Sequence, residues 1–259
     1  MQRIYSVLIW AGIILLILFW LPMLFFRWLF ERDHTKYKTG KLFRKLGLSI
    51  SRINPNWNVS IEGEEKINDR RPYVIISNHL SNADIPVISN LPWEMKWVAK
   101  KELFDLPVVG WMMKMAGDIS VDRSSSNKRL GVFKQCRHYL HNHISVMFFP
   151  EGTRSRSGKL SRFAPGAFDL AIRENIPVLP IVLDGTQGCL PTETWVFKPD
   201  VYVKMKVLEP VDTTSFSNGE TNLLMKEVRS KMAVQLAEWR QAPLHEVDAT
   251  VPLPQADDV

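Results

Sequence analysis

Cysteine is scarce in this chain of 259 residues, which contains only Cys136 and Cys189. Two cysteines provide neither a disulfide framework nor a cysteine-rich zinc site, and they are typical of a reducing compartment. Apolar residues make up 46% of the chain and charged residues 23%, which excludes a largely disordered or low-complexity protein. The mean hydropathy of -0.09 excludes a polytopic membrane protein but allows a single membrane segment.

Several motifs of nucleotide and acyl chemistry are also absent. The sequence has no GxGxxG dinucleotide fingerprint and no GxxxxGK[ST] phosphate loop. It has no GxSxG nucleophile elbow, which argues against a serine hydrolase. His138, His141 and His143 are close in sequence but have no supporting carboxylates, so we interpret them as a solvated helix face rather than a metal site. The sequence therefore predicts neither a metal nor a cofactor.

Positive charge is confined to one short segment. Residues 27–52 hold eight basic residues and two acidic ones, and Arg3 adds one further charge. Because the whole chain carries a net charge of +6, residues 53–259 sum to about -1. The pI of 9.3 thus reflects this segment and not a basic domain, which argues against a nucleic-acid partner.

An uncharged apolar run extends from Ile4 to Phe26. As a helix these 23 residues would measure roughly 34 Å, against a hydrocarbon core of about 30 Å. A cleaved signal peptide has a shorter apolar region followed by small residues, whereas this run ends in Phe25-Phe-Arg-Trp28. We predict a membrane segment over residues 1–30. Pro22 leaves open whether it spans the membrane or enters and returns.

Residues 31–56 follow as a predicted basic amphipathic helix. Its apolar and basic positions interleave at helical spacing: Leu42, Phe43, Leu46 and Ile50 among Lys38, Lys41, Arg44 and Lys45. This pattern is typical of a helix on an anionic lipid surface, and the alternative is a solvated helix packed on the domain. Cations beside a membrane segment favour the cytoplasmic face for the domain that follows.

Residues 57–240 alternate between predicted strands and predicted helices. The strands are expected at 58–62, 73–77, 96–99, 119–122, 146–149, 178–183 and 201–207. The helices are expected at 85–91, 108–115, 126–142, 166–174 and 221–240. This order predicts an α/β domain with a central, mostly parallel or mixed sheet flanked by helices. Residues 241–259 are rich in proline and acidic groups and are expected to form a flexible tail.

Two polar clusters follow apolar strands. In the first, His79 lies two residues after the strand at 73–77 and precedes Asp84 by five residues. A carboxylate in this position can accept the Nδ1 proton and leave Nε2 free as a base, although Asp84 could instead cap a helix. The second follows the strand at 146–149, where a tight turn is predicted from Pro150, Gly152 and Thr153. In this turn Arg154 offers a guanidinium fork to a phosphate or carboxylate.

Four blocks taken together are far more specific than either cluster. They are Asn78-His-Leu-Ser-Asn-Ala-Asp84, Gly117-Asp-Ile-Ser-Val-Asp-Arg123, Phe149-Pro-Glu-Gly-Thr-Arg-Ser155 and Ile176-Pro-Val-Leu-Pro-Ile181. In this order they resemble the glycerolipid acyltransferase family, specifically the 1-acyl-sn-glycerol-3-phosphate (lysophosphatidic acid) acyltransferases, over roughly residues 57–210. The stretch Ala99-Lys-Lys-Glu-Leu103 is similar to the family's lysine-bearing segment.

The resemblance implies a direct acyl transfer without an acyl-enzyme. His79 would deprotonate the sn-2 hydroxyl of 1-acyl-sn-glycerol 3-phosphate while Asp84 orients and charges the imidazole. The product would be phosphatidic acid in phospholipid biosynthesis, and the donor acyl-CoA or acyl-acyl-carrier protein (acyl-ACP). The implied substrate-binding residues are the phosphate clamps Lys100, Arg123 and Arg154, together with Glu151, Gly152 and Thr153 at the acceptor site.

The sequence is also compatible with other interpretations. The acceptor could be another lysolipid or glycerol 3-phosphate, and a thioesterase or lipase-type hydrolase could use the same His–Asp pair on water. A lipid-binding scaffold without activity is disfavoured because the polar residues of both clusters are retained. Ser81 is the only nearby hydroxyl that could act as a nucleophile. The apolar segment 107–115 fits either an acyl channel or lipid contact, or an ordinary core helix.

Overall fold

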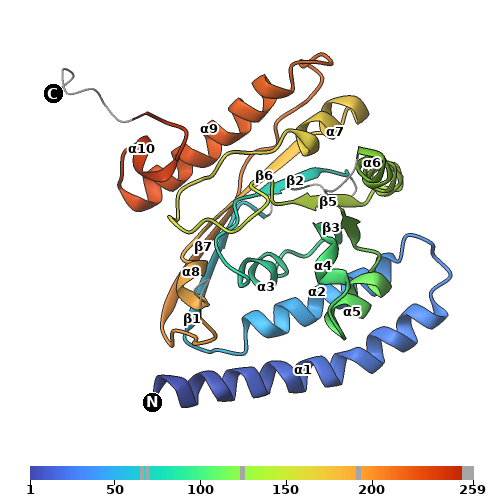
Figure 1. Cartoon of the computed structure of the whole chain (residues 1–259), viewed down its shortest axis with the longest axis vertical. Coiled ribbons are helices and arrows are strands. Elements are labelled where there is room, and N and C mark those ends of the chain that lie inside the picture. The colour runs from blue at the N-terminus through green and yellow to red at the C-terminus, as the bar shows by residue number, and fades with distance from the viewer. Residues whose placement is uncertain (65–66, 68–70, 123–125, 191–193, 253–259) are drawn as a thin grey trace.

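The computed structural model describes residues 1–64, 67, 71–122, 126–190 and 194–252. Its centre is a sheet of seven strands in the order β1-β7-β6-β2-β5-β3-β4 (Figure 1). The strands are β1 (Trp57–Glu62), β2 (Val74–Ser77), β3 (Met95–Lys100), β4 (Ile119–Val121), β5 (Ser145–Phe148), β6 (Val178–Asp184) and β7 (Val201–Val207). Paired neighbours are parallel except β6 and β7, which are antiparallel. The predicted mixed sheet is confirmed.

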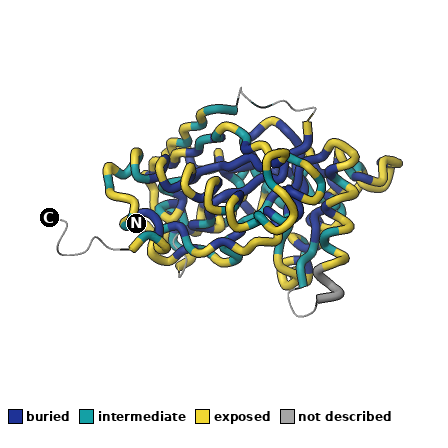
Figure 2. The backbone as a smooth tube through the Cα atoms, turned by 90° about the horizontal axis from the view of Figure 1, so that it is seen from above, coloured by how far each residue is buried: buried dark blue, intermediate teal, exposed yellow. Residues whose placement is uncertain are grey.

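Both faces of the sheet are covered, because its central strands are apolar on both sides. In β2, Val74 and Ile76 face one core and Ile75 faces the other. The first core is completed by α6 (Ser126–His141), α7 (Gly166–Glu174), α9 (Thr221–Arg240) and α10 (Leu244–Val247). The second is completed by α3 (Asp84–Ile88), α8 (Thr186–Cys189) and the N-terminal α1 (Gln2–Phe30). Figure 2 shows buried residues gathered in the middle of the molecule, with the exposed residues around them.

The sequence pattern located the larger elements well. All seven predicted strands and all five predicted helices of the domain occur within three residues of their predicted bounds. The helices that the pattern did not indicate are α4 (Lys101–Phe104), α8 and α10, each of four residues. One helical turn is too short to show an apolar periodicity, so such elements are set by their tertiary contacts.

Helix α1 lies along the domain rather than projecting from it (Figure 1). It is long and apolar enough to cross a membrane, and only 11% of its most apolar stretch of 18 residues is buried. Near its start, the Ser6 hydroxyl accepts a hydrogen bond from the Phe197 N–H at 3.0 Å. Near its end, Leu24 is buried against Leu46 of α2 (Tyr37–Ser51) and Met112 of α5 (Val109–Ala116). Both ends of α1 therefore contact the same domain.

The amphipathic helix α2 packs on protein with its apolar side. Leu46 is buried, and Arg44 is also buried in an ion pair with Asp118 at 2.7 Å. The expectation of a lipid-surface helix is therefore wrong for Leu46 and Arg44, which are buried in the protein. The lysines of the basic side, Lys38, Lys41 and Lys45, are exposed.

The segment after α9 is folded where the structure describes it, so the prediction of a flexible tail from residue 241 is wrong for residues 244–250. Val247 of α10 is fully buried against the domain. Asp248 accepts a hydrogen bond from Arg229 Nε at 2.7 Å. The prediction rested on a composition rich in proline and acidic groups, which does not show that Val247 and Asp248 are buried. The rest of the predicted tail, residues 253–259, lies outside the described residues.

Candidate active site

Most of the predicted site residues lie at one edge of the sheet. Strands β2, β5 and β3 are parallel neighbours, so their carboxyl ends meet at this edge. His79 lies two residues beyond β2, the Pro150–Arg154 turn follows β5, and Lys100 ends β3. This edge of an open α/β sheet is where ligands usually bind. Arg123 lies outside the described residues.

His79 and Asp84 form a hydrogen-bonded pair. Their Nδ1 and Oδ2 atoms are 2.7 Å apart, as the five-residue spacing predicts. Asp84 is fully buried at the first position of α3, and its Oδ2 also accepts the N–H groups of Leu80 at 2.7 Å and Ser81 at 3.0 Å. The His79 side chain is 16% exposed, and no described residue bonds to its Nε2. The pair thus holds the imidazole by one nitrogen and leaves the other available.

Phe149 is a site residue that the sequence did not reveal. Its ring stacks on the His79 imidazole with centroids 4.1 Å apart and planes inclined by 18°. Trp97 of β3 packs beside Phe149, with centroids 5.8 Å apart. The signal in the sequence was its position directly before the Pro150 turn, but an aromatic residue there is equally typical of the core. The stack sets the plane of the imidazole ring, and the hydrogen bond to Asp84 sets which way Nδ1 points within that plane.

The Glu151 carboxylate joins three segments of the site. Its Oε1 accepts the His79 N–H at 2.9 Å, and its Oε2 accepts the Ser161 N–H at 2.8 Å. In the same region the Ser155 N–H donates to the His79 carbonyl at 2.7 Å. Burial raises the pKa of Glu151 above its ordinary value, although the hydrogen bonds from His79 and Ser161 oppose this effect. Glu151 therefore holds the backbone of His79 against the turn that follows β5.

The turn after β5 leaves a guanidinium unpaired. Gly152 has a φ of +71°, a left-handed conformation that glycine adopts at little cost. Thr153 is exposed and Arg154 is partly buried. No described residue forms a hydrogen bond or ion pair with Arg154, and Lys100 is exposed. The turn lies at the same sheet edge as the His79–Asp84 pair, so an unpaired guanidinium on it can bind an anionic group of a substrate.

Two polar side chains near the pair have structural partners instead. The Asn78 amide donates to the Leu183 carbonyl and accepts from the Leu183 N–H, both at 2.8 Å, and so joins the ends of β2 and β6. The buried Ser81 hydroxyl donates to the Leu190 carbonyl at 2.7 Å and accepts from the Ala83 N–H at 3.1 Å. A hydroxyl committed in this way is poorly suited to act as a nucleophile.

The histidines of the α6 region do not gather as metal ligands. His141 Nε2 lies 2.9 Å from a carboxylate oxygen of Glu174, and the His138 ring packs against His34. In the part of the chain that the structure describes, no group of three or more histidine, cysteine, aspartate or glutamate side chains is arranged to hold a metal ion.

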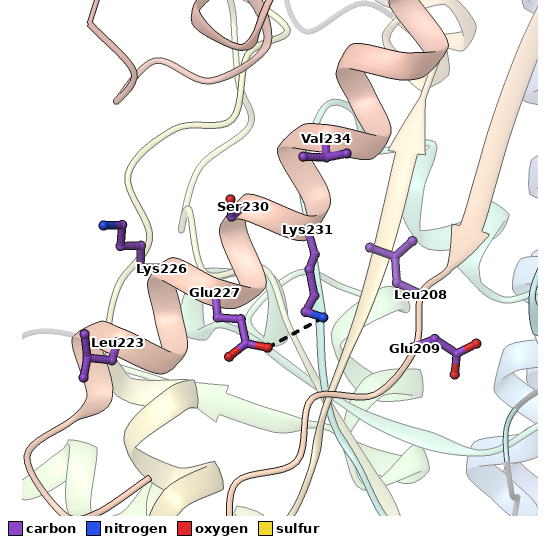
Figure 3. A pocket seen from close by; sticks show the side chains of 8 residues that line it. All are labelled: Leu208, Glu209, Leu223, Lys226, Glu227, Ser230, Lys231 and Val234. Carbon is purple, nitrogen blue, oxygen red and sulfur yellow. Dashed lines mark ion pairs between the residues drawn. The ribbon is translucent and has the colours of Figure 1, made fainter. Parts of the chain in front are cut away.

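A separate groove of about 700 Å³ runs along the solvent side of α9 (Figure 3). It contains none of the predicted site residues. Glu227 and Lys231 pair across one turn of the helix at 3.6 Å, and apolar side chains flank them. The lining residues are Leu208, Glu209, Leu223, Lys226, Glu227, Ser230, Lys231 and Val234. The groove lies on the helix surface and offers no residues for acyl chemistry, so we place the site at the sheet edge.

Comparison with known sequences gives a consistent result. The acyltransferase family model matches residues 58–184, a range that contains both polar clusters. The chain is 34% identical over 202 residues to the chloroplast 1-acyl-sn-glycerol-3-phosphate acyltransferase of Arabidopsis thaliana, covering 78% of this chain and 55% of that relative. It is 30% identical over 207 residues to an uncharacterized acyltransferase of Schizosaccharomyces pombe, covering 78% of this chain and 72% of the relative. The chain thus spans little more than half the length of the chloroplast relative.

A solved structure shares the fold. The crystal structure of the 1-acyl-sn-glycerophosphate acyltransferase PlsC from Thermotoga maritima matches with a TM-score of 0.76 at 27% sequence identity. The match covers 93% of this chain and 98% of the crystallised one.

Proposed function

The chain belongs to the acyltransferase family, and we propose that it transfers a fatty acyl group from a thioester donor to the sn-2 hydroxyl of 1-acyl-sn-glycerol 3-phosphate. The observation that carries this proposal is the His79–Asp84 pair, with its free Nε2 at the same sheet edge as the unpaired Arg154. The relatives named as 1-acyl-sn-glycerol-3-phosphate acyltransferases support the choice of acceptor.

The reaction needs one base and no covalent intermediate. His79 Nε2 takes the proton of the acceptor hydroxyl and the ring becomes an imidazolium. Asp84 stabilises this cation through its hydrogen bond with Nδ1. The acceptor oxygen forms a bond to the thioester carbonyl carbon. The tetrahedral intermediate then collapses, the carbon–sulfur bond breaks, and the thiolate takes the proton back from His79. The products are phosphatidic acid and the free thiol of CoA or of the acyl carrier protein.

The acceptor phosphate fits the cations at the sheet edge. Arg154 can form a charge-assisted, bidentate pair with a phosphate, and Lys100 can add a second charge. Gly152 and Thr153 shape the turn that presents Arg154, and Glu151 fixes this turn to His79. We assign Arg123, which follows β4, to the same clamp on the family resemblance alone. No cofactor enters this scheme.

Substitution of Arg154 by alanine should weaken the use of phosphate-bearing acceptors. Each lost charge-assisted hydrogen bond contributes about 1.5–3 kcal/mol, so losing the two bonds of a bidentate pair should lower kcat/KM for 1-acyl-sn-glycerol 3-phosphate by at least about 100-fold. The measurement compares this acceptor with a phosphate-free monoacylglycerol. With the phosphate-free acceptor, wild type and Arg154→Ala should have similar values of kcat/KM. Equal losses on both acceptors would show that Arg154 has a structural role.

We place α1 in one leaflet of the membrane, parallel to its surface. The contacts of Ser6 with Phe197 and of Leu24 with Leu46 hold both ends of the helix against the domain, so a helix perpendicular to the membrane would carry the domain into it. The side of α1 that faces away from the domain is apolar and exposed. The exposed cations of α2 fit anionic headgroups, and they favour the cytoplasmic face.

The membrane role of α1 is tested best by changing only its outer side. Leu15 and Phe19 are 66% and 63% exposed, so replacing both with aspartate should leave the melting temperature unchanged. Burial of one such side chain contributes about 1.5–3 kcal/mol. Loss of both should therefore weaken binding to anionic vesicles at least 100-fold, as measured by flotation. The matched control replaces Leu223 and Val234, each 55% exposed on α9, with aspartate. Similar losses in both double variants would contradict the placement.

The choice of acceptor is tested with a panel of substrates. Purified protein in lipid would be offered labelled acyl-CoA or acyl-ACP together with 1-acyl-sn-glycerol 3-phosphate, glycerol 3-phosphate or lysophosphatidylcholine. We expect labelled phosphatidic acid as the dominant product. A higher kcat/KM with glycerol 3-phosphate or lysophosphatidylcholine would overturn the assigned acceptor.

A further inference from the structure

The segment that holds Glu151 in place has no regular secondary structure of its own. Residues 151–165 run from the end of β5 to the start of α7 as turns and extended chain. Within this loop the Ser161 N–H donates to Glu151 at 2.8 Å, and the Glu151 carboxylate then accepts the His79 N–H. The position of His79 therefore depends on what holds Ser161.

Arg229 of α9 holds this part of the loop. Its side chain is largely buried, its Nη1 donates to the Ser161 carbonyl, and its Nη2 donates to the Leu160 carbonyl at 2.9 Å. The guanidinium also lies over the Phe163 ring, 4.7 Å from the centroid. A single planar fork thus fixes two consecutive carbonyls and an aromatic ring of the loop.

The C-terminal segment completes the arrangement. Asp248 is 3% exposed and accepts Arg229 Nε at 2.7 Å, so the buried guanidinium has a counter-charge. The backbone of residues 247–249 pairs with Leu160, through Leu160 N–H to the Val247 carbonyl at 2.8 Å and Ala249 N–H to the Leu160 carbonyl at 3.1 Å. Lys159 Nζ donates to the His245 carbonyl at 3.0 Å. We call residues 244–250 the C-terminal brace.

We propose that Arg229 and Asp248 are positioning residues for acyl transfer, which hold Ser161 against Glu151 and thereby fix the backbone of His79 and the turn that carries Arg154. Neither residue lies in the sequence blocks that mark the reaction, and both belong to segments far from those blocks in the chain. This inference rests on the proposed function, since it assigns an activity-related role to the loop. The chemistry remains with His79.

The other buried charges do not offer an equivalent connection. Arg44 and Asp118 join α2 to the sheet, and Lys96 and Glu94 pair with each other beneath the same helix. Arg240 donates to the Gly158 carbonyl at 2.9 Å, but among the described residues no hydrogen bond joins Gly158 to Glu151 or His79. Among the described ion pairs, that of Arg229 and Asp248 is linked to the Glu151 carboxylate through one residue, Ser161.

The test compares Asp248→Asn with Val247→Ala. The first variant removes the counter-charge of Arg229, whereas the second removes buried methyl groups of the same brace and leaves every hydrogen bond in place. Both should lower the melting temperature. Assayed well below both melting temperatures, Asp248→Asn should lower kcat/KM for the acceptor on the order of 10-fold or more with the KM for the donor unchanged, because small misplacements of reacting groups are costly. Val247→Ala should stay within about twofold of wild type.

Hydrogen exchange supplies a readout that does not depend on activity. Amide exchange at Ser161 and His79 should accelerate in Asp248→Asn and not in Val247→Ala. Equal kinetic losses in the two variants, or unchanged exchange at Ser161, would overturn the positioning role. If wild-type protein transfers no acyl group to any lysolipid, the proposed function fails, and exchange still reports whether the brace holds the loop.

Discussion

Replacement of His79 by alanine should lower the rate of acyl transfer by about 10²–10⁴-fold, the usual contribution of a general base. Among the described residues of the sheet edge, the two nearest alternatives are already engaged: the Ser81 hydroxyl is buried and hydrogen-bonded, and the Glu151 carboxylate accepts two backbone N–H groups. The fold should persist, because the His79 backbone rather than its side chain bonds to Glu151 and Ser155. Initial rates at saturating donor and acceptor measure the effect.

The matched control is His141→Ala, which removes an exposed histidine at the end of α6 that pairs with Glu174. This variant should keep the wild-type rate. Retention of more than roughly a tenth of the wild-type rate by His79→Ala, with its melting temperature intact, would show that His79 is not the base.

Substitution of Asp84 by asparagine should cost nearly as much activity. The carboxylate oxygen Oδ2 accepts three hydrogen bonds, from His79 Nδ1 and from the N–H groups of Leu80 and Ser81. An amide cannot stabilise the imidazolium as a carboxylate does. In a Ser-His-Asp triad, the corresponding change lowers kcat about 10⁴-fold through the wrong tautomer. We expect a loss of roughly 10²–10⁴-fold in kcat, with a smaller effect on the KM of either substrate.

Asp169→Asn provides the comparison for Asp84→Asn. Asp169 forms a surface ion pair with Arg173 in α7, and a pair of this kind contributes little to stability or catalysis. A full wild-type rate in Asp84→Asn would mean that Asp84 only caps α3, which is the alternative that the sequence left open.

Much of the fold was predictable because the domain's strands are continuous apolar runs that end in polar turns. The strand ending at Ser77 and the helix ending at Glu174 occur where the pattern places them. The strand order was not predictable, since pairing between distant strands depends on packing that single-strand patterns do not encode. Lys96 illustrates this limit: a lysine in a strand favours an exposed face, yet here it is fully buried against Glu94 at 2.9 Å.

The site divides in the same way. The spacing of His79 and Asp84 predicts their contact, because five residues span the turn between the end of a strand and the first residue of the next helix. The stack of Phe149 on the imidazole and the bond from Ser161 to Glu151 could not be predicted, since each depends on how a loop without regular structure folds back on the sheet edge. The packed C-terminal segment was missed for the same reason.

In the proposed reaction, the His79–Asp84 pair activates a lipid hydroxyl and not water. The most direct measurement follows a labelled acyl group from its thioester donor into products, with and without 1-acyl-sn-glycerol 3-phosphate, for wild type and His79→Ala. We predict that wild type places the label in phosphatidic acid only when the acceptor is present, releases little free fatty acid, and loses this activity with His79. Rapid release of labelled fatty acid that is independent of the acceptor would contradict the account and identify a hydrolase.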